Sequence, residues 1–231
     1  MPIQSEITDS VNKSVEEICN YFQDNPSFFF TENDIVCYFY SILKQNLREF
    51  KFPDKDNKLH SIIHMEYPTP FRCDMKDYEF KPKSDDDRTK NGGKYKRGHY
   101  DVVVLNPEFI SQYSYDIIKA QNYESFKKEE VLNKLLFKPV IYGIEIIFKR
   151  DKIKFPDNKD NKGIEKTFGI FLKQINQDFE KLQHSRIETK FMDNIKMLVF
   201  IRESSHEVKK YINQRLSNYI NKQEIKICFA K

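Results

Sequence analysis

The sequence predicts an α/β protein of the α+β type, with helices packed against one mixed β-sheet. Two apolar runs, 100–105 and 140–148, are typical of strands that are buried on both faces. Apolar residues at helical spacing precede, separate and follow these runs. The predicted order is α-α-β-β-β-α-β-α-β, in which three consecutive strands favour an antiparallel meander and the next helix favours a crossover to a parallel strand.

The length of 231 residues suits one domain with a full hydrophobic core. We predict a single domain over 1–231, with insertions at about 73–98 and 106–138. The mean hydropathy is low, at -0.71, but 20 Phe and 13 Tyr exclude a disordered chain. The net charge of +4 is compatible with nucleic-acid binding without indicating it.

Two helices are predicted before the sheet. Residues 9–23 carry apolar side chains at helical spacing, and an Asn-Pro pair ends this helix. The second helix covers 31–47. Thr31 is a suitable N-cap, and Asp34 three residues later completes a capping box.

The meander follows, with strands predicted at 59–67, 99–105 and 139–149. The prolines at 68 and 70 would close the first strand. We expect a long solvated hairpin loop at 73–98, and a polar insertion at 106–138 that is helical near 124–137. The remaining elements are a helix at 163–183, a strand at 195–201, a helix at 206–221 and a strand at 225–229.

The cysteines and the N-terminus indicate the compartment. The four cysteines form no C-x-x-C pair, so we expect reduced thiols and no zinc site, with Cys37 and Cys228 in packed elements. The first residues do not resemble a signal peptide, and no apolar run is long enough to span a membrane. We therefore predict a cytoplasmic protein without membrane contact.

Four acidic residues lie where a metal site would need them. Glu32 opens the second helix, Glu66 is near the end of the first strand, Asp101 is near the start of the second, and Glu145 is within the third. Because the end of one meander strand adjoins the start of the next, Glu66 and Asp101 are predicted neighbours. Crowded carboxylates repel one another, and Mg²⁺, Mn²⁺ or Ca²⁺ would relieve the repulsion.

Each of these acids also has a simpler explanation. Glu32 would stabilise its helix through the helix dipole alone. Glu66 would be an ordinary solvated acid at the end of a strand. Asp101 and Glu145 are harder to explain in this way, because both interrupt apolar strands in which a buried charge is costly.

With these acids in this order, the sequence resembles the PD-(D/E)xK nuclease superfamily, which has the restriction-endonuclease-like fold. The segments that carry the resemblance are His64–Pro70, Arg97–Val104, Gly143–Glu145 and Gln177–Leu182. The resemblance implies an αβββαβ core from 31 to 202, preceded by one helix and followed by a helix-strand extension.

The resemblance also implies the activity, which would be that of a Mg²⁺-dependent endodeoxyribonuclease with Mn²⁺ as a substitute ion. Asp101 and Glu145 match the metal-binding acids of the superfamily, and the backbone carbonyl of Ile146 would be a further ligand. Glu66 would be an additional catalytic acid. The accessory residues would be Glu32 and His99.

The lysine of the superfamily motif is displaced in this sequence. It belongs two residues after the strand acid, where this chain has Ile147. Lys149 lies on the same strand face as Glu145 and is the candidate for the catalytic role. It is about 13 Å along the strand from Glu145, against about 7 Å for a spacing of two residues.

Two basic clusters flank the predicted acidic site and favour contact with DNA phosphates. The predicted nucleic-acid-binding residues are Lys94, Lys96, Arg97 and Arg150. The alternative is that these lysines only keep a Phe-rich protein soluble.

The displaced lysine leaves a second function open, that of a catalytically degenerate relative acting as a nucleic-acid-binding or protein-interaction module. The sequence also leaves open whether the protein is a monomer or a homodimer.

Overall fold

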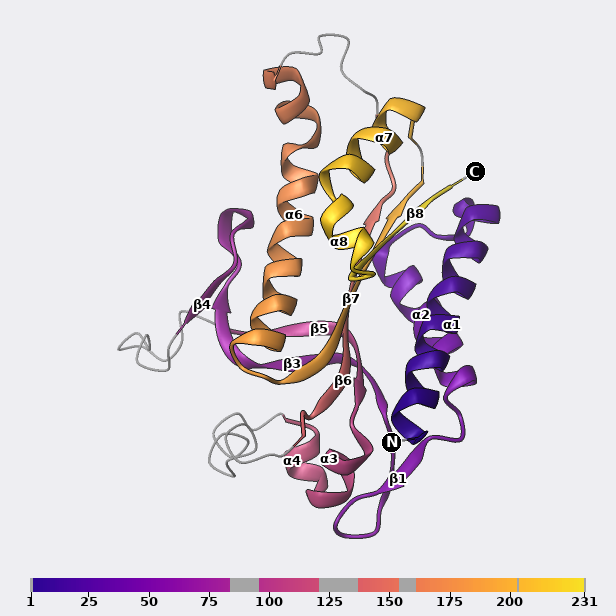
Figure 1. The fold of residues 1–231 in the computed structure, drawn as a ribbon, viewed down its shortest axis with the longest axis vertical. Coiled ribbons are helices and arrows are strands. Elements are labelled where there is room, and N and C mark those ends of the chain that lie inside the picture. Colours follow the sequence, from indigo (N-terminus) through magenta and orange to yellow (C-terminus); the bar gives the residue numbers. More distant parts are fainter. Residues whose placement is uncertain (1, 84–95, 121–136, 154–160, 203, 231) are drawn as a thin grey trace. The chain divides into compact units, whose positions relative to one another are not determined.

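The computed structural model describes residues 2–83, 96–120, 137–153, 161–202 and 204–230 (Figure 1). The strands are β1 (Lys51–Pro53), β2 (Leu59–Ser61), β3 (Ile63–Asp74), β4 (Lys81–Lys83), β5 (Lys96–Leu105), β6 (Val140–Lys149), β7 (Met192–Ile201) and β8 (Ile225–Phe229). The helices are α1 (Pro2–Asp24), α2 (Glu32–Asn46), α3 (Pro107–Gln112), α4 (Tyr115–Ile118), α6 (Asn161–Ile187), α7 (His206–Arg215) and α8 (Ser217–Asn221), with short 3-10 turns η1 (Pro26–Phe28) and η2 (Lys76–Tyr78).

The predicted α+β class with a mixed sheet is confirmed. Six strands are hydrogen-bonded in the order β4-β3-β5-β6-β7-β8, and β1 and β2 form a separate antiparallel pair. β3 pairs with β5 and β5 with β6, both antiparallel, which confirms the predicted meander. β7 and β8 pair in parallel.

The contacts divide the chain into two compact units. Unit 1 comprises Met1–Leu47, Glu145–Asn176 and Lys196–Lys231, and unit 2 comprises Arg48–Ile144 and Gln177–Ile195. The division falls within β6, α6 and β7, so each of these elements contributes to both units.

In unit 1, α1 and α2 lie side by side (Figure 1). The predicted capping box of α2 is confirmed: Thr31 Oγ1 accepts from the Asp34 N–H at 3.2 Å, and Asp34 Oδ2 accepts from the Thr31 N–H at 2.8 Å. The backbone N–H groups of Phe30 and Thr31 lower the pKa of the Asp34 carboxyl. α1 begins at Pro2 rather than at residue 9, because its buried stripe continues back to Ile7.

Phe22 lies in the aromatic core of unit 1 and is fully buried. Its ring centroid is 5.0 Å from that of Phe200 on β7 and 6.0 Å from that of Phe148 on β6. The ring of Phe29, which follows η1, is 5.9 Å away. Phe22 thus packs α1 against both β6 and β7 within unit 1.

Phe22→Ala should lower the free energy of unfolding by about 3–5 kcal/mol, because it removes a large buried ring and leaves a cavity. Urea unfolding followed by circular dichroism would measure this loss. Phe28→Ala is the matched control, since Phe28 is 55% exposed and its removal should cost about 1 kcal/mol or less. Equal losses for the two variants would contradict the assignment of Phe22 to the core.

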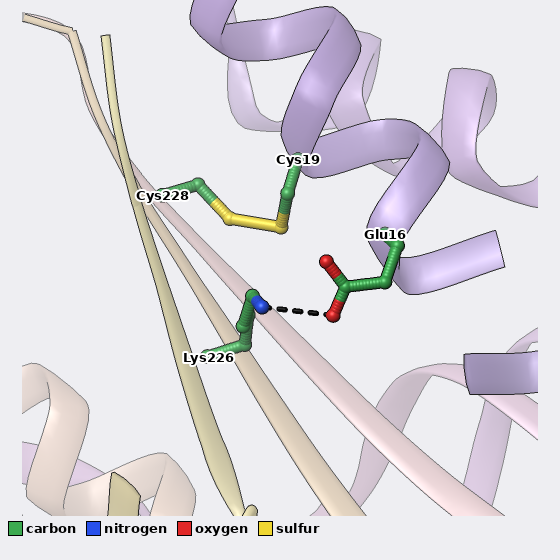
Figure 2. The surroundings of a disulfide bond; sticks show 4 residues. All are labelled: Glu16, Cys19, Lys226 and Cys228. Carbon is green, nitrogen blue, oxygen red and sulfur yellow. Dashed lines mark hydrogen bonds and ion pairs between the residues drawn. A yellow bond between two sulfur atoms is a disulfide. The ribbon is translucent and has the colours of Figure 1, made fainter. Parts of the chain in front are cut away.

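A disulfide joins Cys19 of α1 to Cys228 of β8 (Figure 2). The prediction of reduced thiols is wrong for this pair, because the two Cα atoms lie 5.5 Å apart, within the range that a disulfide spans. Beside it, Lys226 Nζ lies 2.8 Å from Glu16 Oε1 (Figure 2). Cys228 is buried as predicted, whereas Cys37 on α2 is exposed rather than packed.

In unit 2, β3 is longer than predicted. It continues through Pro68 and Pro70 to Asp74 instead of ending before the prolines. The reason is that the register with β5 shifts between Pro68 and Arg72: Pro68 forms the last pair before the shift, opposite His99, and Pro70 lies where the ladder is interrupted. Within the shifted segment, Thr69 Oγ1 donates to the Phe71 carbonyl at 2.7 Å.

The two predicted insertions contain more structure than expected. The segment 73–98 is not only a loop, because it contains the end of β3, then η2, β4 and the start of β5, and β4 pairs with β3. The segment 106–138 begins with α3 and α4, whose apolar side chains at 109–110 and 117–118 are buried. The helix predicted near 124–137 lies almost entirely outside the described residues.

The C-terminal elements follow the prediction closely. α6 and β7 each extend a few residues beyond the predicted bounds, and β8 matches them. The predicted helix 206–221 is interrupted at Leu216, which separates α7 from α8. No helix in the described part of the chain is long and apolar enough to cross a membrane. Cytoplasmic localisation stays a prediction.

Candidate functional site

Glu66 and Asp101 occupy facing positions on β3 and β5 in unit 2, as predicted. The register is set by the pairs on either side, which are Met65–Val102 and Tyr67–Tyr100. Between these pairs, Glu66 falls opposite Asp101. Asp101 is half-buried and Glu66 is exposed.

The backbone of Glu66 departs from regular strand geometry. Its φ is 51°, in the left-handed region that non-glycine residues rarely adopt. This conformation breaks the regular pair with Asp101, and Glu66 lines a pocket of unit 2. Backbone outliers of this kind cluster at functional sites, which favours a role for this position.

The other two predicted acids belong to unit 1. Glu145 is 3% exposed on β6, and Ile146 after it is 2% exposed. Glu32 Oε2 accepts a hydrogen bond from the Phe148 N–H at 3.1 Å, so the start of α2 is fixed to β6 three residues after Glu145. Asp101 belongs to unit 2, and a metal site shared by Asp101 and Glu145 stays a prediction.

The lysine position of the motif is filled by an apolar side chain. Ile147 is 6% exposed and belongs to the core. Lys149 is half-exposed at the end of β6, where its carbonyl accepts from the Arg202 N–H at 3.1 Å. Since β6 runs as one strand from Val140 to Lys149, the separation of Lys149 from Glu145 stays about 13 Å along the strand.

A second lysine has surroundings that the sequence did not indicate. Asp178 and Lys181 both lie on α6, where Lys181 is 5% exposed and Asp178 is half-buried. Lys181 Nζ donates to the His99 carbonyl at 2.9 Å and lies 3.5 Å from Asp178 Oδ1. Burial raises the pKa of Asp178, and the Lys181 ammonium opposes that shift. The Lys181 amine is therefore hydrogen-bonded to the backbone of β5 two residues before Asp101.

The residues predicted to bind nucleic acid differ in their surroundings. Arg97 is held inside unit 2, where its Nε donates to the Thr69 carbonyl at 2.7 Å and its Nη1 donates to the Ala120 carbonyl. Arg150 is exposed, and its Nε lies 3.3 Å from Asp151 Oδ1. Lys94 lies outside the described residues, and Lys96 is described only as part of β5.

Three of the predicted residues share one pocket of unit 2, with a volume of about 390 Å³. They are Glu66, Arg97 and His99. The other polar residues that line this pocket are His60, His64, Tyr67, Tyr115 and Lys119. Their sequence signal is that three of the five histidines of the chain, His60, His64 and His99, occur in this part of it.

The hydrogen bonds of two of these histidines define their tautomers. His60 Nε2 lies 2.8 Å from Asp54 Oδ2. Burial alone would raise the pKa of Asp54, but N–H groups of Lys58, His60 and Asp56 hold it below its ordinary value, so the carboxylate accepts. His64 Nε2 lies 2.9 Å from the Ser61 carbonyl, which can only accept. Both Nε2 atoms therefore carry hydrogen.

The implied metal, Mg²⁺, keeps several water ligands and needs only one or two carboxylates from the protein. No three His, Cys, Asp or Glu side chains within the described ranges lie close enough together to hold an ion. Glu66 and Asp101 are carboxylates at facing strand positions, which is the type of donor that Mg²⁺ prefers. A Mg²⁺ site that includes them stays a prediction.

Comparisons with known proteins identify no family for this chain. No protein-family model matches it, and neither a curated protein nor a solved structure does. Any function is therefore inferred from the residues themselves.

Proposed function

We propose that this protein is a Mg²⁺-dependent nuclease that hydrolyses phosphodiester bonds in DNA. The observation that carries the proposal is the facing position of Glu66 and Asp101 on β3 and β5, at a point where the Glu66 backbone is strained. Further support comes from the order of α2, β3, β5, β6, α6 and β7, which is that of the αβββαβ core. Glu145 would be the second main metal ligand, by the resemblance of its strand.

In this proposal each residue has a defined task. A bound Mg²⁺ would supply a polarised phosphate and an activated water. Asp101 and Glu145 would hold the ion, with the Ile146 carbonyl as a further ligand, and Glu66 would orient the attacking water. Lys149 would stabilise the negative charge that develops on the phosphate.

DNA is proposed as the substrate because exposed cations follow the strand that carries Glu145. Arg150 and Lys152 are both exposed after the end of β6. Such side chains contact phosphates without regard to base sequence, and their binding weakens with salt. Cleavage without strong sequence preference is therefore expected.

The test is a cleavage assay on supercoiled plasmid and on single-stranded DNA. We expect nicking or linearisation with Mg²⁺ or Mn²⁺ and none with EDTA, because the proposed chemistry needs a divalent ion. Asp101→Asn purified in the same way is the control for contaminating nuclease. Cleavage that persists in EDTA, or none with either metal, would refute the proposal.

A second function is favoured by one specific observation. The buried Ile147 occupies the position of the superfamily lysine, so the chain would bind nucleic acid or a protein partner without catalysis. DNA binding that is measurable by a gel-shift assay, together with no cleavage under any metal condition, is the result that this alternative predicts.

A further inference from the structure

The pocket of unit 2 has polar groups whose positions are fixed by neighbouring residues. His60 is held by Asp54, and its ring stacks on that of Tyr115 at 5.5 Å between centroids and 8° between planes. His64 is held by the Ser61 carbonyl. Side chains that are held in this way need little reorganisation when a ligand binds.

The lysine of the pocket, Lys119, is also held in place by neighbouring residues. Lys119 Nζ lies 2.9 Å from Asp116 Oδ1 and 5.1 Å from the centroid of the Tyr115 ring. The hydrogen bond to Asp116 raises the pKa of Lys119, so the amine is a cation at neutral pH. The Lys119 side chain is itself 30% exposed, so the ion pair with Asp116 leaves part of it accessible to a further anion.

The charges on the pocket wall favour an anionic ligand. Arg97 and Lys119 are cations, and Glu66 is the acid among the residues that line the pocket. The Nε2 atoms of His60 and His64 donate to Asp54 and to the Ser61 carbonyl, so both rings are held in place by the protein.

We propose that this pocket binds a phosphate monoester, with Lys119 and His99 as the principal donors. Lysine suits phosphate as a compact point charge, and a phosphate group offers several oxygens to donors on different sides. A volume of about 390 Å³ falls in the range of small-molecule sites and accommodates a mononucleotide.

The binding site does not depend on the proposed nuclease activity, because no divalent ion takes part in it. The phosphate could come from a free nucleotide or from the 5′ end of a nucleic-acid strand, which share the same chemistry. Both kinds of ligand would contact the same cationic side chains. A comparison of the affinities of the two ligands therefore shows which source the pocket prefers.

Isothermal titration calorimetry in EDTA tests the proposal directly, with 5′-AMP and a 5′-phosphorylated dinucleotide as separate ligands. Adenosine and the unphosphorylated dinucleotide are the ligand controls. We expect the phosphorylated ligands to bind and the controls not to bind. Tighter binding of 5′-AMP indicates a free nucleotide as the ligand, and tighter binding of the dinucleotide indicates a strand end.

Substitutions then locate the site. Lys119→Ala and His99→Asn should each weaken binding about tenfold or more, the effect of losing one charge-assisted hydrogen bond. Lys55→Ala is the matched control, because Lys55 is an exposed lysine of unit 2 outside the pocket. Thermal melts would establish that all three variants fold. No binding of either phosphorylated ligand, or equal weakening by Lys55→Ala and Lys119→Ala, would overturn the proposal.

Discussion

Asp101→Asn should reduce Mg²⁺-dependent DNA cleavage by at least about a hundredfold, because it replaces a carboxylate ligand with a neutral amide. The substitution keeps the size of the side chain, and Asp101 is half-buried rather than fully enclosed in the core. The fold should therefore be retained, with a melting temperature within a few degrees of that of the wild type.

The matched control for this substitution is Asp56→Asn. Asp56 is an exposed acid of the same unit as Asp101. It lies outside β3 and β5, so it faces no acid across that strand pair. We expect it to retain full cleavage activity. Equal activity of Asp101→Asn and the wild type would remove Asp101 from the site, whatever the fate of the other acids.

Lys149→Ala should abolish cleavage while leaving the fold and metal binding intact. A single side chain that stabilises charge in a transition state contributes about 10²–10³ in rate. Lys149 is half-exposed at the end of β6 and contributes little to the core, so the melting temperature should change by only a few degrees. Lys173→Ala, which removes an exposed lysine of α6 in unit 1, is the control.

The outcome for Lys149 decides which lysine acts. Full activity of Lys149→Ala would exclude it and direct attention to Lys181, whose Nζ lies 2.9 Å from the carbonyl of His99 in the same unit as Asp101. Lys181→Met would then be the next variant to measure. A loss of activity in Lys173→Ala equal to that in Lys149→Ala would indicate a general effect of positive charge on DNA binding.

Much of the fold was predictable because its elements carry strong local patterns. The capping box of α2 and the apolar runs of β5 and β6 gave the type and the approximate bounds of these elements. The end of β3 was not predictable from its prolines, because a register shift between Pro68 and Arg72 accommodates them. Propensity describes one residue at a time, whereas a register shift depends on two strands.

The candidate site was predictable in part, where it depends on the order of the strands. The facing of Glu66 and Asp101 follows from the order of the meander strands. The burial of Lys181 does not, since it depends on how the C-terminal part of α6 packs within unit 2. Long-range pairs such as Cys19 with Cys228, which are 209 positions apart, leave no local pattern in the sequence.

The most direct test of the proposed nuclease site is the binding of Mn²⁺ to the wild type and to Asp101→Asn, measured by electron paramagnetic resonance without DNA. We expect the wild type to bind Mn²⁺, Mg²⁺ to compete for the same site, and Asp101→Asn to bind at least about tenfold more weakly. Equal Mn²⁺ binding by the two proteins, or no binding by the folded wild type, would rule out the proposed metal site.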